Sequence, residues 1–339
     1  MDSGVRIRRW DNVKGALIVL VVLGHTLDIF TNDSEDARSL FFFIYIFHMP
    51  LFIFVSGLFS KRCVRERNYK KAIPFLVLYF FIKILRCISI MIAKGQFFIE
   101  LLGDDGAPWY CLFIFFAYLI TMGIQSADKK YVLICSVVLA CFAGYDVSIG
   151  DELVLSRLIV FYPFFYMGYC LEAKDLERIF SEKIFRVIAA VSLVAVGVIV
   201  FALGDEIYEL RPLLTGRNPF KKLDVEYIDY GALLRFFYYF VVIFIGACFI
   251  AVIPEKSKIL TFLGNRSLQI YGLHFTVLQL LEHRANIPEV YAKIWPAHFV
   301  WLTVPTAILV AMLCSLKVFG APFDYIRRNG EKKPEQAVV

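Results

Sequence analysis

Two ionisable residues stand at the ends of an uncharged stretch near the start of the chain. Lys14 and His25 enclose the sequence GALIVLVVLG, which contains no charged residue. In a helix, eleven residues turn through about 1,100° and rise about 16 Å, so both side chains lie on one face. A lysine binds anions, and an imidazole, whose ordinary pKa is close to neutral pH, accepts a proton from a hydroxyl group. The pair therefore predicts a stripe with one anion-binding end and one proton-accepting end.

Two acidic residues accompany this pair at helical spacing. Asp11 precedes Lys14 by three residues and Asp28 follows His25 by three, so each is expected to pair with its neighbour. Asp28 would then orient the His25 imidazole, as a carboxylate does beside other catalytic bases. Two alternatives stay open. Lys14 extends to the inner lipid headgroups, or His25 forms a hydrogen bond to a neighbouring helix.

A second apolar stretch, FHMPLFIFVSGLF at residues 47–59, carries a matching set of residues. If it runs antiparallel to the first stretch, His48 lies near the depth of His25, and Ser56 and Gly57 lie at the level of the lysine. Gly57 permits the close approach of a ligand or of a neighbouring helix. We expect an outer layer with two histidines and an inner layer with a cation. Ordinary helix packing is the alternative explanation for the glycine.

Four further residues are candidates for binding a substrate. Trp109 and Tyr110 open an apolar stretch at its expected outer end, where aromatic rings stack on sugars but also belong to the usual interfacial belt. Arg157 is predicted to hold an anionic group or to lie at the interface. His274 is expected about 10 Å from the inner surface, as a site residue or as a packing residue.

The elements that must position these residues are membrane helices. Of 339 residues, 59% are hydrophobic and 19% are charged, and the mean hydropathy is +0.67. This leaves too little polar surface for a soluble domain of this size, so the expected fold class is all-α, a polytopic membrane bundle. About ten transmembrane helices are predicted, at 13–30, 40–60, 73–93, 109–124, 131–146, 154–171, 184–204, 232–253, 267–282 and 297–318.

Lysines and arginines set the expected orientation. They concentrate in the segments that lie on one side of the membrane if the N-terminus is cytoplasmic, so both termini are predicted to be cytoplasmic. The same topology and the lipid headgroups account for the net charge of +6 without a nucleic-acid partner. We expect one membrane domain over residues 1–320 and a cytoplasmic tail over 321–339, solvated and disordered from Arg327 onward. The eight cysteines occur singly, which indicates free thiols and neither a disulfide framework nor a metal site.

Several of these stretches together resemble a known family. The chain resembles the acyltransferase-3 family of integral membrane O-acyltransferases, and in particular its fucose 4-O-acetylase-like branch. The motif of that family, a basic residue and a histidine separated by ten residues, falls on Lys14 and His25, although the family more often has arginine at the first position. The resemblance covers about residues 10–320 and rests on WDNVKGALIVLVVLGH (10–25), FHMPLFIFVSGLF (47–59), PWY (108–110), FYPFFYMGYCLE (161–172) and SLQIYGLHF (267–275).

The resemblance implies an enzyme of a bacterial plasma membrane that moves an acyl group, expected to be acetyl, from acyl-coenzyme A to a sugar hydroxyl. Acetyl-CoA is the expected donor co-substrate, with no permanently bound cofactor, and the acceptor is a cell-surface polysaccharide or a lipid-linked glycan. His25 is the expected base, oriented by Asp28, and His48 or a nearby hydroxyl is expected to stabilise the oxyanion. An acetyl-histidine intermediate is the variant. The expected donor-binding residues are Lys14, Asp11, Ser56, Gly57 and the basic segment 61–71, and the expected acceptor-binding residues are Trp109, Tyr110, Arg157 and His274.

Two other functional classes are compatible with the pattern. A transporter or flippase also has many spans with buried charges, but no paired repeat with interrupted helices is evident. A non-catalytic scaffold among glycan-assembly partner proteins predicts that substitutions of these polar residues have no effect. Transfer of a radiolabelled acyl group to glycan distinguishes an enzyme from both.

Overall fold

The computed structural model describes residues 8–331 except 99, 104–105, 107 and 151, and within that part of the chain all regular structure is helical. Six stretches are long and apolar enough to cross a membrane, and a seventh forms if α15 (Ile287–Ile294) and residues Phe299–Cys314, which are bent by 119°, count as one span. The all-α, multi-pass class is thereby confirmed, and ten crossings and cytoplasmic termini stay predictions. The six stretches contain α1 (Arg8–Asp28), α2 (Glu35–Leu58), α4 (Ile73–Lys94), α7 (Leu155–Cys170), α9 (Lys183–Tyr208) and α12 (Gly231–Val252).

Each of the ten predicted stretches falls on a helix. The four that are shorter than a full span are α5 (Trp109–Gly123), α6 (Lys129–Ala143), α14 (Ser267–His283) and α16 (Thr303–Cys314). Shorter helices connect them: α3 (Lys61–Arg65), α8 (Ala173–Ser181), α10 (Arg211–Leu214), α11 (Val225–Ile228), α13 (Lys258–Asn265) and α17 (Ala321–Glu331), with 3₁₀ turns at Tyr69–Lys71, Glu152–Val154, Phe220–Lys222, Phe299–Leu302 and Lys317–Phe319.

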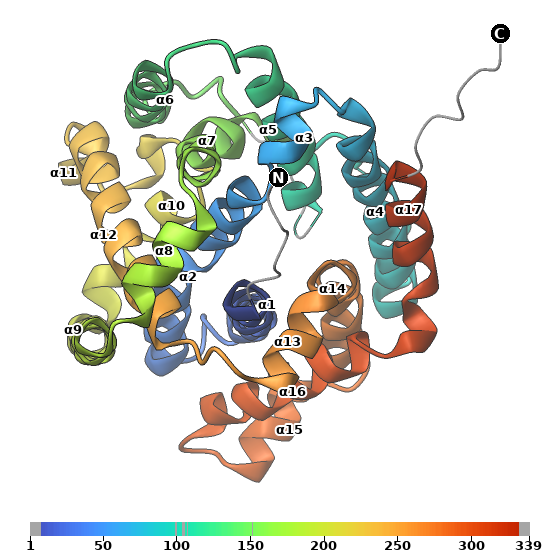
Figure 1. Ribbon diagram of the computed structural model, residues 1–339. Helices are drawn as coiled ribbons and strands as arrows, with labels where there is room; N and C mark the ends of the chain where they lie inside the picture. The colour runs from blue at the N-terminus through green and yellow to red at the C-terminus, as the bar shows by residue number, and fades with distance from the viewer. Residues whose placement is uncertain (1–7, 99, 104–105, 107, 151, 332–339) are drawn as a thin grey trace, which may run out of the picture.

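Helix α1 is the central element, and α9 lies at the edge. Viewed in Figure 1, α1 is seen nearly end-on near the middle of the bundle, with α2, α13, α14 and α16 around it. The apolar stretch of α1 is 72% buried, whereas that of α9 is only 17% buried. In water, the exposed valines of α9 would be costly, but in lipid tails they are not. The end of the bundle where α1 begins is called the Lys14 end below, and the other is the His25 end.

Glycines allow two pairs of helices to approach closely. A Cβ atom at Gly57 on α2 would lie 1.9 Å from the carbonyl oxygen of Phe165 on α7, and one at Gly168 on α7 would lie 2.1 Å from that of Phe54. The same arrangement joins α1 to α13. A Cβ at Gly264 would lie 1.9 Å from the carbonyl oxygen of Asp11. Such small residues let backbones meet in a membrane, where packing and not the hydrophobic effect holds helices together.

The expected disordered tail begins later than predicted. Helix α17 continues to Glu331 and packs against α4, with Phe323 buried and its ring 5.6 Å from that of Phe81, edge to face. The prediction of disorder from Arg327 is therefore wrong as far as residue 331. Its cause is the apolar anchor at Phe323, which ties the start of the helix to the bundle. The remainder of the predicted tail, 332–339, lies outside the described residues.

Candidate active site

Two cavities meet inside the bundle on the face of α1 that carries Lys14 and His25. The Lys14 cavity measures about 160 Å³ and is lined by Lys14 and Ser56 among others. The His25 cavity measures about 170 Å³ and is lined by His25 and His48 among others. Three residues line both cavities, so the two adjoin: Val21, Met49 and Tyr271. The two polar layers expected from the sequence thus correspond to two adjoining cavities.

The Lys14 cavity contains the predicted inner layer. The Lys14 ammonium lies 2.9 Å from the Asp11 carboxylate, so the predicted ion pair is confirmed. Asp11 is almost fully buried and holds the lysine in place. Ser56 Oγ donates to the Phe52 carbonyl oxygen at 2.9 Å and lies 2.6 Å from the Tyr110 hydroxyl. Since Ser56 has a single hydroxyl proton, Tyr110 is the donor in that second bond.

The two neighbouring aromatic residues Trp109 and Tyr110 line different cavities. Both were expected at the outer interface, and both are instead buried, because α5 begins inside the bundle. Tyr110 lines the Lys14 cavity, which corrects its assignment to the outer layer. Trp109 lines the His25 cavity, and the Arg157 guanidinium lies 4.3 Å from the centre of its ring. Arg157 also donates to the Thr215 carbonyl oxygen at 3.2 Å, so an aromatic face and a cation are fixed together on one wall.

Three imidazoles lie near one another at the His25 end, and two of them, His25 and His48, line the His25 cavity. The rings of His25 and His274 are 5.3 Å apart, and the Tyr45 ring lies 6.4 Å from that of His25 and 4.7 Å from that of His48. His48 Nδ1 lies 2.8 Å from the Ile44 carbonyl oxygen. Because a carbonyl oxygen only accepts, Nδ1 carries the hydrogen there, and Nε2 of the neutral ring is left with a lone pair.

His274 has the same tautomer as His48, with the hydrogen on Nδ1, and its Nε2 is buried without a hydrogen-bond partner in the described part of the structure. Its Nδ1 lies 2.8 Å from the Tyr271 carbonyl oxygen. His274 was predicted nearer the Lys14 end, and that depth is wrong. Helix α13 folds in against the first third of α1, so α14 starts at Ser267 already inside the bundle, and the seven residues from there add about 10 Å of depth.

The predicted pair of His25 and Asp28 is not formed. The Asp28 carboxylate accepts a hydrogen bond from Arg211, on α10, at 2.9 Å, and no hydrogen bond joins it to His25 within the described ranges. Asp28 is the last residue of α1 and its side chain is half exposed, so a cation from a distant segment reaches it more easily than the imidazole one turn below. Asp28 still lines the His25 cavity, but it does not orient the base.

Gly57 does not face a ligand. Its α-carbon lies against the backbone of α7, at the contact with Phe165 described above, which leaves no space for a donor molecule. The packing explanation is correct for this residue, and its assignment to the donor site is wrong. Ser56, one residue earlier and about 100° around the helix, is the residue that faces the Lys14 cavity.

Comparison with known proteins assigns the bundle to a family. A family model described as an acyltransferase domain matches residues 7–316, nearly the whole chain. The chain belongs to the acyltransferase-3 family. No solved structure has significant similarity to it.

Two curated proteins resemble part of this acyltransferase-3 family member. The nodulation protein NolL of Sinorhizobium fredii is 29% identical over 186 residues, which cover 50% of this chain and 49% of that protein. NolL of Mesorhizobium japonicum is 25% identical over 177 residues, 47% of this chain and 46% of that protein. The chain spans about half the length of the curated relatives it matches.

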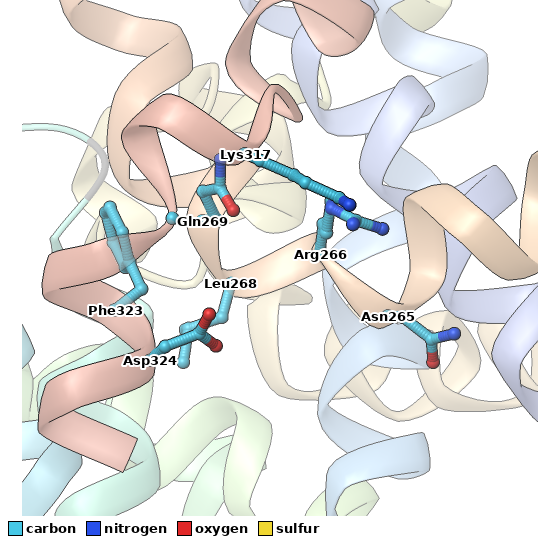
Figure 2. Close-up of a pocket in the computed structure, with 8 residues that line it drawn as sticks. Asn265, Arg266, Leu268, Gln269, Lys317, Phe323 and Asp324 are labelled. Carbon is cyan, nitrogen blue, oxygen red and sulfur yellow. The ribbon is translucent and has the colours of Figure 1, made fainter. Parts of the chain in front are cut away.

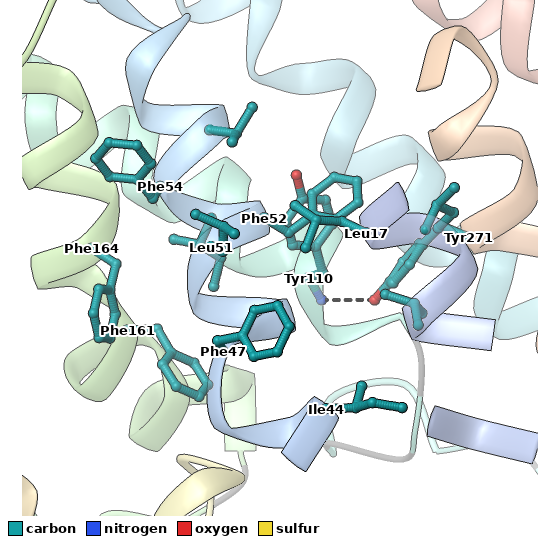
Figure 3. Close-up of a cluster of buried hydrophobic side chains, with 14 of the residues drawn as sticks. Leu17, Ile44, Phe47, Leu51, Phe52, Phe54, Tyr110, Phe161, Phe164 and Tyr271 are labelled. Carbon is teal, nitrogen blue, oxygen red and sulfur yellow. Dashed lines mark hydrogen bonds between the residues drawn. The ribbon is translucent and has the colours of Figure 1, made fainter. Parts of the chain in front are cut away.

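Among the residues of the candidate site that sequence reasoning missed is Tyr271. Its side chain lines both cavities, and its hydroxyl oxygen accepts the backbone N–H of Tyr110 at 3.2 Å, the bond dashed in Figure 3. The phenol proton is therefore left to donate to a group at the junction. The signal was present, because Tyr271 precedes His274 by three residues and shares its helix face.

The acyltransferase-3 bundle holds no candidate metal cluster in the part that the structure describes, where no three His, Cys, Asp or Glu side chains converge to hold an ion. All eight cysteines are described and are free, as predicted. The polar groups that line the two cavities thus include imidazoles, phenols, a lysine, a serine hydroxyl, a carboxylate and three arginines.

Proposed function

We propose that this protein is a bacterial plasma-membrane O-acyltransferase that moves an acyl group, expected to be acetyl, from acyl-coenzyme A to a hydroxyl of an exported or lipid-linked glycan. One observation carries the proposal: the Lys14 and His25 cavities adjoin at Val21, Met49 and Tyr271. A thin thioester arm extending from the Lys14 end reaches the histidines through this junction. The acceptor enters the His25 cavity from the opposite side.

The excess of lysine and arginine in segments at the Lys14 end supports placing that end in the cytoplasm, where acyl-coenzyme A is made. The His25 end then faces the outside of the cell. This orientation separates a charged donor from its acceptor across the membrane, so only the acyl group crosses. It also places both termini in the cytoplasm.

The proposed reaction is a direct transfer. An imidazole nitrogen of His25 takes the proton of the acceptor hydroxyl, and the oxygen forms a bond to the thioester carbonyl carbon. The negative charge on the former carbonyl oxygen is stabilised by the Tyr271 phenol proton at the junction. When the carbon–sulfur bond breaks, the coenzyme A thiolate takes the proton back from the imidazolium. The products are an ester and free coenzyme A.

The geometry changes the role proposed for His48. With Nδ1 donating to the Ile44 carbonyl oxygen, a neutral His48 presents a lone pair and has no N–H left for an oxyanion. Its Nε2 is suited to accept a hydrogen bond from an acceptor hydroxyl in the His25 cavity, whereas His274 is fully buried behind His25 and does not line that cavity. Trp109 and Arg157 form the wall on which a sugar ring and an anionic substituent would rest.

The test is release of coenzyme A by the purified protein with acetyl-coenzyme A and a surface glycan extract. His25→Ala should lower turnover about 100-fold or more, in the range for loss of a general base. His298→Ala, which changes an exposed histidine, is the matched control and should leave turnover unchanged. A folded His25→Ala protein with wild-type turnover would exclude the proposed base, and absence of radiolabelled acetyl on the glycan would favour a transporter.

A further inference from the structure

A polar hollow at the Lys14 end, which Figure 2 shows, is larger than either the Lys14 cavity or the His25 cavity. It measures about 480 Å³ and lies between the start of α14 and the segment 317–324. Leu268 lines both this hollow and the Lys14 cavity, so the two adjoin. Its polar lining consists of Asn265, Arg266, Gln269, Lys317 and Asp324.

Two cations of this hollow come from segments far apart in the chain. Arg266 lies between α13 and α14, with its guanidinium 4.0 Å from the centre of the Phe262 ring, so its plane is fixed by stacking. In Figure 2 the Lys317 side chain extends toward Arg266. The N-terminal end of the 17-residue helix α14 adds positive potential at the same place. One carboxylate, that of Asp324, opposes them.

The wall that carries Lys317 is fixed to α14. The Gln269 side-chain amide donates to the carbonyl oxygens of Cys314 at 2.7 Å and Leu316 at 2.8 Å. Those bonds hold the end of α16 and the residue before Lys317 against α14, which begins directly after Arg266. The two cations therefore face one space without a chain rearrangement, which favours tight binding of an anion.

We infer that this hollow binds the phosphorylated nucleotide end of the acyl donor, with Arg266 and Lys317 on its phosphates; the inference rests on the proposed function. Size supports it, since small-molecule sites measure about 300–1,000 Å³ and the Lys14 and His25 cavities are too small for a nucleotide. Position supports it too, because the hollow adjoins the Lys14 cavity at Leu268, so the thin arm would continue past this residue.

The basic segment 61–71 is the competing location for the phosphates. Two of its six cations are engaged in ion pairs: Lys61 pairs with Glu172, and Arg62 lies 2.9 Å from Glu66. Neither of these ion pairs contributes to the hollow beside α14. We therefore place the phosphate site between the N-terminal end of α14 and the Lys317 segment. The sequence pattern did not indicate a site there.

The experiment measures binding of coenzyme A and of dephospho-coenzyme A to the full-length protein in lipid nanodiscs by titration calorimetry. We expect the wild type to bind coenzyme A more tightly, and Arg266→Gln and Lys317→Gln each to weaken coenzyme A binding about tenfold and to reduce the preference for the 3′-phosphate. Lys317→Arg, which keeps the positive charge, should retain most of the wild-type affinity for coenzyme A. A merely structural role of Lys317 would not give this result. Lys183→Gln, an exposed change on α9, is the matched control.

The outcomes separate the two proposals. If the wild type binds coenzyme A and both variants bind it equally well, while Lys70→Gln in the competing segment weakens it, the inference is overturned and the proposed function stands. Equal affinity of the wild type for the two forms of coenzyme A also overturns it. If the wild type binds neither form and transfers no acetyl group, the proposed function itself fails.

Discussion

At the scale of single residues, short-range spacing was predicted well and long-range pairing was not. Asp11 and Lys14 are one helical turn apart and form the predicted ion pair. Asp28 stands at the same distance from His25, yet it pairs with Arg211, a residue 183 positions away. A helical period states which neighbours are within reach, but it says nothing about a stronger partner that tertiary structure brings to the same carboxylate.

The junction tyrosine provides a residue-scale prediction. Tyr271→Phe removes the phenol proton and keeps the ring, so we expect turnover to fall about 100-fold, as for loss of one oxyanion donor, with little change in coenzyme A binding. The measurement is steady-state coenzyme A release alongside titration of coenzyme A.

Tyr131→Phe is the control for that measurement, because Tyr131 is exposed on α6. If Tyr271→Phe weakens donor binding and leaves the maximal rate unchanged, the phenol acts in binding and not on the oxyanion.

At the scale of elements, the helices followed from hydropathy and their packing did not. Each apolar stretch must satisfy its backbone within itself in lipid, and therefore it forms a helix wherever it is long enough. The segment 258–265 is short and only partly apolar, and nothing in its period indicates that α13 folds inward against α1. That inward position brings His274 to the depth of His25. The depth of His274 was predicted wrongly because it was counted in residues from the membrane surface.

The contact between α2 and α7 provides an element-scale prediction. Gly57→Ala puts a methyl group 1.9 Å from the Phe165 carbonyl oxygen, so the helices must separate, at a cost of about 1–3 kcal/mol in stability. Figure 3 shows the side chains of Phe54 on α2 and Phe164 on α7, which line a common space between these helices and would move apart with them. The measurement is the midpoint of thermal unfolding in detergent.

Gly197→Ala on α9 is the matched substitution, since a Cβ there meets nothing within 4 Å. The alanine should leave the midpoint unchanged or raise it slightly through its higher helix propensity. Equal midpoints for both variants would contradict the role of Gly57 in packing.

At the scale of the whole molecule, the structure contains a line of cavities that no single stretch of sequence encodes. The hollow beside α14 adjoins the Lys14 cavity at Leu268, and that cavity adjoins the His25 cavity at Tyr271. The sequence predicted the Lys14 and His25 cavities, because a lysine and a histidine in an apolar helix are conspicuous, but it did not indicate the hollow beside α14. The junction between the Lys14 and His25 cavities is made of ordinary residues such as Val21 and Met49, whose importance depends only on where the fold places them.

The line of cavities is best tested by an experimental structure of the protein with coenzyme A bound in a lipid nanodisc. We expect the nucleotide between Arg266 and Lys317, the arm between Val21 and Met49, and the sulfur beside His25. Coenzyme A bound elsewhere, or an α1 helix whose Lys14 and His25 side chains face lipid with no cavity between them, would contradict this expectation.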